Sequence, residues 1–398
     1  MAITDKKTGP WGLDQVYNKI NQGSIWTYRN AGGLYIWGGD SWNSGSTGQN
    51  DRANRSSPIQ IPGDWALDNS IFASGNKLSM GEQATLGAIK NDGTLWGWGG
   101  NSKGWLGQNN ITQYSSPVQV PGTTWKTMSL AGTNCQTVHC IKTDGTMWGW
   151  GDNDNGQLAV GSKTEYSSPV QIPGTTWKAA ITGGHKFMGF KTDGTLWVCG
   201  RNTDGQLGLN NKTDYQAPQQ IPGTTWGESF ACQDATGAAL KTDGTLWTWG
   251  DNGAGGLGHN NRTEYSSPKQ VPGTTWSKIG SGIQNCMLGL KTDGTLWSWG
   301  TNDNGQLGQN SQTTYSSPVQ IPGTTWDNVE ITMGYHVVAH KTDGTFWTWG
   351  TNSNGQLGHN DRNKRSLPTQ VPGTKWREVY SGYDYFFGKQ TGLSPSQL

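Results

Sequence analysis

The chain has 398 residues, of which 61 are Gly and 23 are Trp, while hydrophobic residues make up 32% and charged residues 14% of the total. This composition differs from that of a disordered tail and from that of an ordinary α/β enzyme. The formal net charge is +1 and there is no Lys/Arg run that could follow a phosphate backbone, so nucleic acid is not an expected partner.

The N-terminal segment, residues 1–22, is predicted to form a docking arm. It lacks the apolar stretch of a secretory signal, and no window of the chain approaches 18 consecutive apolar residues, which predicts synthesis in the cytoplasm and no membrane insertion. Apolar residues recur in the arm at helical spacing, which predicts a short amphipathic helix. The candidate docking residues are Trp11, Leu13, Val16, Tyr17 and Ile20. The alternative is that this helix caps the rest of the fold.

Seven similar segments follow the arm, and self-similarity at a fixed period predicts a repeat architecture. The clearest copies run from Lys241 to Gly250, from Lys291 to Gly300 and from Lys341 to Gly350. The second tryptophans of these copies lie 50 residues apart. The first copy, from Arg29 to Gly38, is degenerate.

Each clear copy has an Asp-Gly pair between two strand-like runs, which predicts a hairpin with a type I′ turn and positive φ at both central residues. Trp-x-Trp follows, and a period of two sends both indoles to one face of the strand, where we expect a neighbouring sheet. Trp249, Trp299 and Trp349 are therefore predicted to be buried between sheets. The Asp-Gly pairs are Asp92-Gly93, Asp144-Gly145, Asp193-Gly194, Asp243-Gly244, Asp293-Gly294 and Asp343-Gly344.

The strand before each turn carries a small residue two positions before its Lys or the equivalent of that Lys. A repeated small residue is expected where strands converge, so this strand is predicted to be the innermost of a radial array of sheets around a central channel. The small residues are Ala88, Cys140, Gly189, Ala239, Gly289 and Ala339.

A polar loop with Gly-Gln-Leu-Gly, such as residues 305–308, leads into a run with proline at two fixed places, such as Pro318 and Pro322. Proline cannot donate a hydrogen bond to a ladder, so this run is predicted to be an outer edge strand that discourages aggregation. A final Trp closes each copy: Trp65, Trp125, Trp177, Trp226, Trp276, Trp326 and Trp376.

The hairpin, the Gly-Gln-Leu-Gly loop and the proline-marked edge, in this order, resemble the regulator-of-chromosome-condensation repeat. The resemblance covers roughly residues 24–392 and implies an all-β fold, a seven-bladed β-propeller of four-stranded antiparallel blades, placed at residues 23–392 with a tail at 393–398. Two departures are an insertion at residues 66–80 and the sequence Gly156-Gln157-Leu158-Ala159, which breaks the loop pattern.

Both ends of the repeat region look like innermost strands, at residues 24–29 and 383–390. Seven blades would then have eight strands of this type. The two ends are therefore expected to meet in one composite blade that closes the ring.

Residue patterns that could carry chemistry are few. Asp152-Asn153-Asp154-Asn155-Gly156 resembles part of a calcium loop but lacks the closing Glu, so a plain turn is favoured over a metal site. The six His are scattered. Cysteine occurs without a Cys-x-x-Cys pair, which favours buried thiols over a disulfide or a metal site. The cysteines are Cys135, Cys140, Cys199, Cys232 and Cys286.

No nucleophile elbow, P-loop or paired-carboxylate motif is present, so neither enzymatic activity nor a cofactor is expected. Four Asn-x-Ser/Thr matches, at Asn54, Asn110, Asn211 and Asn261, are interpreted as coincidences of Asn-rich loops. The Gly-Trp-Arg-His-Thr motif of a plant ultraviolet-B photoreceptor in the same repeat family is missing. The distinctive insertions of the founding nucleotide-exchange activity are not recognisable either.

The leader from Met1 to Trp26 resembles leaders of virion structural proteins from bacteriophages that infect marine cyanobacteria. This resemblance implies a non-enzymatic virion subunit, such as a fibre, an appendage or a capsid decoration. The arm would bind other virion structural proteins, and the propeller would face a host surface protein or glycan. The expected location is the virion, after synthesis in the host cytoplasm. The alternative is a cytoplasmic propeller adaptor or lectin-like module that binds a protein or a glycan.

Overall fold

The computed structural model contains strands and no helix among the residues that it describes. In that part of the chain, no segment has both the helical form and the apolar length that crossing a membrane requires. The predicted arm and tail, with the five candidate docking residues, lie outside it. The structure describes residues 34–390 except for 39–43, 46, 54, 67–77, 81–85, 131–136, 282–284, 332–334, 354, 373–375 and 382–385.

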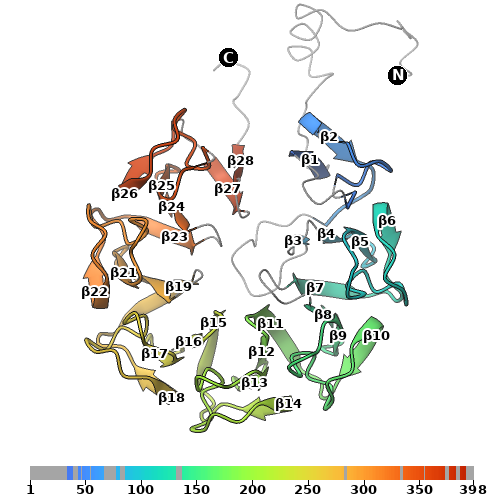
Figure 1. Cartoon of the computed structure of the whole chain (residues 1–398), viewed down its shortest axis with the longest axis horizontal. Coiled ribbons are helices and arrows are strands. Elements are labelled where there is room, and N and C mark those ends of the chain that lie inside the picture. Colours follow the sequence, from blue (N-terminus) through green and yellow to red (C-terminus); the bar gives the residue numbers. More distant parts are fainter. Residues whose placement is uncertain are drawn as a thin grey trace, which may run out of the picture.

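Six four-stranded antiparallel sheets stand around a common centre (Figure 1). Each sheet contains four consecutive strands, which we name inner, second, third and outer. The inner strands are β3 (Leu78–Met80), β7 (Trp125–Leu130), β11 (Trp177–Gly183), β15 (Trp226–Cys232), β19 (Trp276–Ser281) and β23 (Trp326–Ile331). The second strands are β4 (Leu86–Ile89), β8 (Thr137–Lys142), β12 (Lys186–Lys191), β16 (Thr236–Lys241), β20 (Cys286–Lys291) and β24 (His336–Lys341). The third strands are β5 (Leu95–Gly99), β9 (Met147–Gly151), β13 (Leu196–Gly200), β17 (Leu246–Gly250), β21 (Leu296–Gly300) and β25 (Phe346–Gly350). The outer strands are β6 (Tyr114–Gln119), β10 (Tyr166–Ile172), β14 (Tyr215–Gln220), β18 (Tyr265–Gln270), β22 (Tyr315–Gln320) and β26 (Arg365–Gln370).

Two two-stranded sheets occupy the remaining arc of the ring (Figure 1). One pairs β1 (Leu34–Gly38) with β2 (Arg55–Ile61), in the register that joins third and outer strands elsewhere. The other pairs β27 (Trp376–Ser381) with β28 (Phe386–Gln390), in the register that joins inner and second strands. The prediction of repeated four-stranded antiparallel blades is confirmed, and the described residues form six complete blades and two half-blades.

The prediction that the strand before the Asp-Gly turn is innermost was wrong. The sheet order is β19-β20-β21-β22, and β19, which begins at Trp276, lies nearest the centre (Figure 1). The Trp thought to close each copy therefore begins the next sheet. The small residue has another cause: a Cβ on Gly289 would lie 2.5 Å from the Trp276 indole, so this indole takes the space that a side chain would fill.

The turn type was also predicted wrongly. Gly244 has a φ of 78°, but Asp243 is not among the residues with positive φ. Lys241 donates its backbone N–H to the Thr245 carbonyl at 2.9 Å, and Gly244 donates to the Lys241 carbonyl at 3.0 Å. This is a type I turn followed by a left-handed Gly, the usual three-residue hairpin loop. The Asp243 carboxylate accepts the backbone N–H of Thr245 at 2.9 Å, which fixes the turn.

The two departures from the repeat pattern are absorbed into the ring. The segment interpreted as an insertion, residues 66–80, contains β3, the inner strand of the first complete sheet. In the loop Gly156–Ala159, Ala159 adopts a φ of 64°. The equivalent residues of other copies, Gly208 and Gly308, also have positive φ. The chain thus keeps the same backbone path at this position without glycine.

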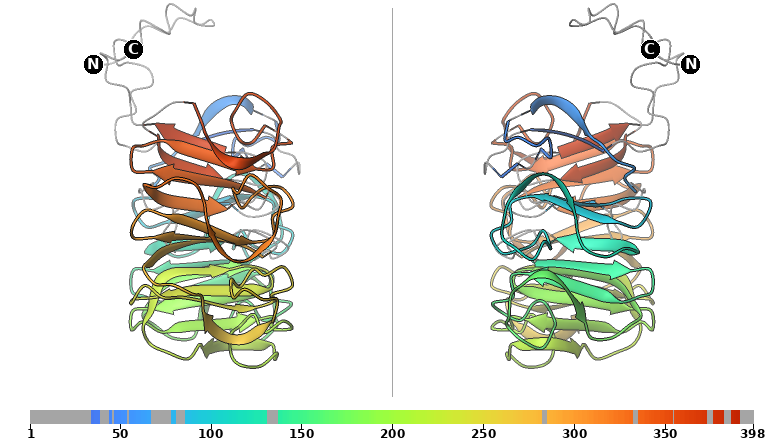
Figure 2. Two further views of the ribbon diagram at one scale, coloured as in Figure 1. Left: turned by 90° about the vertical axis from the view of Figure 1, so that its left-hand side faces the viewer. Right: turned by 90° about the vertical axis from the view of Figure 1, so that its right-hand side faces the viewer.

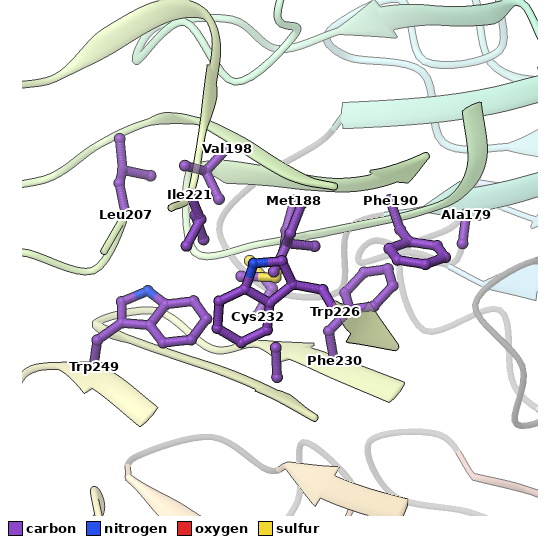
Figure 3. Packing of buried hydrophobic residues seen from close by; sticks show 12 residues of the cluster. Ala179, Met188, Phe190, Val198, Leu207, Ile221, Trp226, Phe230, Cys232 and Trp249 are labelled. Atoms are coloured by element: carbon purple, nitrogen blue, oxygen red, sulfur yellow. The ribbon is translucent and has the colours of Figure 1, made fainter. Parts of the chain in front are cut away.

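The hydrophobic core lies between neighbouring sheets. Figure 3 shows one such interface, where Met188 and Val198 of one sheet face Trp226 and Trp249 of the next. Trp249, Trp299 and Trp349 are each 0% exposed, as predicted. Trp226 makes edge contacts with Trp247 and Trp249, which confirms that the Trp-x-Trp indoles share one face.

The outer strands carry the predicted proline and form the rim of the ring (Figure 1). Loop residues tie each rim strand to the next copy: Asn310 donates its N–H to the Ser366 carbonyl at 2.7 Å, and Asn50 donates to the Ser115 carbonyl at 2.7 Å. The hydrogen bond from Asn50 shows that the half-blade β1-β2 contacts the next sheet in the same way as the complete blades do.

Candidate binding faces

The strands run from one flat side of the disk to the other, so loops gather on two faces (Figure 2). We call one of them the turn face. It carries the Asp-Gly turns and the loops that lead from each outer strand to the next inner strand, such as residues 321–325. The other, the loop face, carries the long loops between third and outer strands, such as residues 301–314, and the hairpins between inner and second strands.

A buried Asn organises each long loop of the loop face. Asn302 donates through Nδ2 to the Ser311 carbonyl at 3.0 Å and to the Thr313 carbonyl at 2.9 Å, while its Oδ1 accepts the Leu307 N–H at 2.9 Å. This residue was not predicted from the sequence, although it follows the third strand at the same place in every clear copy. The equivalent residues are Asn101, Asn153, Asn202, Asn252 and Asn352.

We expect Asn302→Ala to lower the free energy of unfolding by about 2 to 3 kcal/mol, because it leaves buried backbone groups without partners. Urea unfolding measures this loss. Asp303→Ala, an exposed change in the same loop, is the matched control and should stay within about 0.5 kcal/mol of the parent. Equal losses for the two variants would contradict a structural role for the Asn.

The Asn-x-Thr matches on the loop face have a structural explanation. Asn261 accepts the Thr263 backbone N–H through Oδ1 at 2.9 Å and donates through Nδ2 to the His259 carbonyl at 3.2 Å. Asn110 and Asn211 make the same contacts in their own loops. These motifs are therefore Asx turns, in which the Asn side chain replaces a backbone acceptor.

The calcium-like loop carries an acidic group formed by Asp152, Asp154 and Glu165. The ammonium of Lys103, from the neighbouring copy, forms ion pairs with Asp154 and Glu165. Burial raises the pKa of Asp152, whose Oδ2 accepts the Gln157 Nε2 at 3.1 Å. The acidic side chains are thus partnered within the protein.

The described histidines and cysteines form no shared cluster with metal-binding geometry. Cys140, Cys199, Cys232 and Cys286 are buried free thiols, and Cys135 lies outside the described residues. Burial raises the pKa of the Cys286 thiol to about 12, which keeps it protonated and unreactive.

Burial lowers the pKa of His139 to about 3, and its Nδ1 lies 2.6 Å from the Thr182 hydroxyl. Because the unfolded chain binds the proton near the ordinary pKa of about 6.5, stability is complete above that pH and falls as the pH drops toward 3. At pH 5 we expect a loss of about 2 kcal/mol from this residue. Urea unfolding at pH 7 and pH 5 tests this, and His139→Gln should reduce the difference by about 2 kcal/mol. The same decline in both proteins would contradict the assignment.

On the turn face, a lysine ammonium lies over two indole rings in each of the six complete sheets. Lys291 Nζ is 4.8 Å from the ring centroid of Trp276 and 4.5 Å from that of Trp297. Trp276 is buried, whereas Trp297 is half-exposed. A cation over an indole face is attracted by the ring quadrupole, so each lysine is held in place while remaining partly exposed. The other five lysines are Lys90, Lys142, Lys191, Lys241 and Lys341.

The half-exposed indole is fixed from its other side by the turn. Trp297 donates its indole N–H to the Thr295 hydroxyl at 2.9 Å, and this hydroxyl donates to the Asp293 carboxylate at 2.7 Å. The two hydrogen bonds from Thr295 lower the pKa of Asp293. Each blade thus presents the same rigid set of a cation, an aromatic ring and a carboxylate. The sequence analysis missed this set.

Five copies, at residues 144–189, 193–233, 243–288, 293–339 and 343–387, match the model of the regulator of chromosome condensation (RCC1) repeat, and together they cover more than half of the chain. The chain belongs to the RCC1 repeat family. It is 28% identical to the ultraviolet-B receptor UVR8 of Arabidopsis thaliana over 144 residues, which is 35% of this chain and 30% of the receptor. It is 31% identical to protein RCC2 of Homo sapiens over 85 residues, 21% of this chain and 16% of RCC2. The matches span less than a third of either relative.

Solved structures share the fold. Human WBSCR16 superimposes with a TM-score of 0.71 at 18% identity, covering 91% of this chain and 100% of that one. Prp20p of Saccharomyces cerevisiae gives a TM-score of 0.68 at 18% identity, covering 90% of this chain and 92% of that one. The ring of four-stranded sheets is therefore an RCC1-type propeller.

Proposed function

We propose that this RCC1-repeat protein is a non-enzymatic binding scaffold whose turn face engages a protein partner. The observation that carries the proposal is the set of six lysine and tryptophan pairs repeated around that face. Tryptophan is among the side chains that contribute most to protein interfaces. Related propellers support a protein partner: Prp20p was studied for its binding to Gsp1p and histones, and yeast RCC1 was solved bound to Kap60.

Lysine-directed cross-linking tests the proposal, because lysines mark both faces. Lys241, Lys291 and Lys341 report on the turn face, whereas Lys103 and Lys212 report on the loop face. After cross-linking in extracts of the source cells, we expect a stoichiometric partner whose cross-links concentrate on the turn face. Cross-links confined to the loop face, or no stoichiometric partner, would overturn the proposal.

A second candidate function, a bacteriophage virion subunit, rests on the resemblance of the leader, Met1 to Trp26, to virion proteins. Its partners would be other virion structural proteins, bound through the arm, with a host surface protein or glycan as a further ligand of the propeller. Mass spectrometry of purified particles tests this candidate, and absence of the chain from them would sink it.

The arm itself is tested by the double variant Val16→Asp, Ile20→Asp. If the apolar stripe docks, the variant should fail to join particles or a partner while the propeller unfolds at an unchanged temperature. If the stripe caps the propeller, the variant should lower stability by several kcal/mol, at about 1.5 to 3 per buried residue. Loss of stability with retained incorporation would contradict docking.

A further inference from the structure

The loops that lead into the inner strands differ in sequence. Five read Pro-Gly-Thr-Thr-Trp, the last, residues 372–376, reads Pro-Gly-Thr-Lys-Trp, and the first, residues 62–65, is one residue shorter and reads Pro-Gly-Asp-Trp. In the short loop, Trp65 donates its indole N–H to the Ile61 carbonyl at 3.0 Å, and Asp64 accepts from Asn91 at 2.7 Å. In the five long loops the corresponding indole N–H is buried and has no acceptor among the described residues: Trp125, Trp177, Trp226, Trp276 and Trp326.

Four of the five long loops are also strained, and the loop before Trp226 is the exception. Thr275 and Thr325 have φ values of 66° and 67°, in the left-handed region, and Thr124 and Thr176 share this conformation. A β-branched residue is a true outlier there, because its side chain crowds the backbone. Strained residues of this kind cluster at ligand sites, where the surrounding structure holds them. The short loop has no such residue at its Asp64 position.

Two donors converge beside the glycine in three of the long loops, at Gly174, Gly273 and Gly323. A Cβ on Gly323 would lie 3.3 Å from Lys341 Nζ and 3.7 Å from Trp326 Nε1, and a Cβ on Gly174 would lie 3.3 Å from Lys191 Nζ. The glycine thus leaves the lysine ammonium and the indole N–H facing the same side of the loop. In the described part of the chain, neither lysine has a carboxylate within 4 Å.

We propose that the five Pro-Gly-Thr-Thr-Trp loops are subsites on the turn face, each binding a carboxylate from an acidic segment of the partner protein. The lysine supplies the charge and the indole N–H supplies a second donor. In four of the loops the strained Thr lets the loop open to admit the oxygen. The first loop is a closed copy, in which the chain satisfies its own indole. This inference rests on the protein-binding role proposed for the turn face.

Discrete carboxylates fit this face better than a continuous polyanion. Each lysine is followed two residues later by the exposed Asp of its turn, such as Asp293 after Lys291. A phosphate backbone laid around the ring would meet these six carboxylates in turn, and like charges repel at this range. Side chains spaced along a peptide can instead reach the lysines and avoid the Asp residues.

The test uses the full chain, labelled with ¹⁵N in its tryptophan indoles, and hexaglutamate as the probe. We expect hexaglutamate to shift the indole N–H signals of the five long loops and to leave that of Trp65 unchanged. Absence of indole shifts at millimolar peptide would overturn the proposal. Sodium sulfate at equal ionic strength distinguishes the source of the oxyanion: shifts with sulfate and none with hexaglutamate would overturn the acidic-segment assignment.

Two variants locate the subsite. Grafting the short loop, by replacing Thr274 and Thr275 with a single Asp, should abolish the Trp276 shift and leave the other four. This graft is expected to fold, since residues 62–65 already carry that loop. Lys291→Met should weaken binding at the same loop by about tenfold, because a charge-assisted hydrogen bond is lost. Lys212→Met, on the loop face, is the matched control and should leave the indole shifts unchanged.

A Trp276 signal that still shifts in the graft would overturn the subsite. The outcome is also separable from that of the protein-binding role. Cross-links on the turn face, together with indole N–H signals that do not shift, would overturn the carboxylate subsites and leave the protein-binding role standing. Responsive indoles without turn-face cross-links would remove the proposed function.

Discussion

Replacing Trp299 by Ala should lower the free energy of unfolding by about 3 to 5 kcal/mol, as other large core truncations do. The indole is 0% exposed and lies between two sheets. Its N–H reaches back to the preceding copy and donates to the Gly256 carbonyl at 2.9 Å. Its ring meets that of Trp276 edge-on, with centroids 5.9 Å apart. The truncation therefore opens a cavity and leaves a buried carbonyl without its donor.

Trp297 on the same strand is the matched control for this measurement. It is half-exposed, and its N–H bonds only to Thr295 within its own turn. Trp297→Ala should therefore cost less than about 2 kcal/mol, since much less area leaves water on folding. Denaturant unfolding of both variants gives the comparison. A Trp299→Ala loss below about 1 kcal/mol, or equal losses for the two, would contradict the assignment of Trp299 as an inter-sheet residue.

Much of the fold could be predicted because side-chain period and backbone chemistry are local properties. Trp247 and Trp249 share a face because they are two residues apart in a strand, and Pro318 must lie on an edge because it lacks an N–H. Neither argument depends on where the strand lies in the ring. For this reason the buried indoles and the rim strands were placed correctly, whereas the strand nearest the centre was not.

The position of a strand along the blade depends on contacts between strands. A residue type that recurs at one position of the repeat does not show these contacts. Gly289 was interpreted as a sign of crowding at the centre, but the indole of Trp276 from the adjacent strand causes it. The turn was misassigned for a related reason. Asp-Gly occurs in both two-residue and three-residue hairpin loops, and only the bond from Lys241 to Thr245 distinguishes them.

The candidate site was hidden because its members come from three strands. Lys291 follows Trp276 by 15 residues and precedes Trp297 by six, so no short motif contains all three. A signal was nevertheless present. The same spacings recur in the copies around Lys241 and Lys341. Core packing does not hold a surface lysine at a fixed position, so this recurrence indicated another role. The Asn of each long loop was missed because Asn is common in polar loops, so its recurrence there did not mark it as structural.

Removing residues 383–398 should destabilise the whole ring, because it deletes β28 and leaves β27 without its partner. Phe386 and Phe387 take the register positions of Met287 and Leu288, which are buried in β20. Two large apolar side chains at about 1.5 to 3 kcal/mol each give an expected loss of about 3 to 6 kcal/mol. The truncation of residues 391–398, which begins after β28, is the control and should unfold at the temperature of the full chain.

The comparison also tests ring closure. No pairing between β28 and β1 occurs among the described residues, but the two half-blades complement each other in strand type and lie side by side in the ring (Figure 1). We expect the order β27-β28-β1-β2, a seventh blade in which both ends of the repeat region pair. Deleting β28 should then expose the edge of β1 as well. Native-state hydrogen exchange should rise in residues 34–38 of the longer truncation and stay unchanged in the shorter one. Faster exchange confined to β27, with β1 still protected, would show that the two half-blades do not pair.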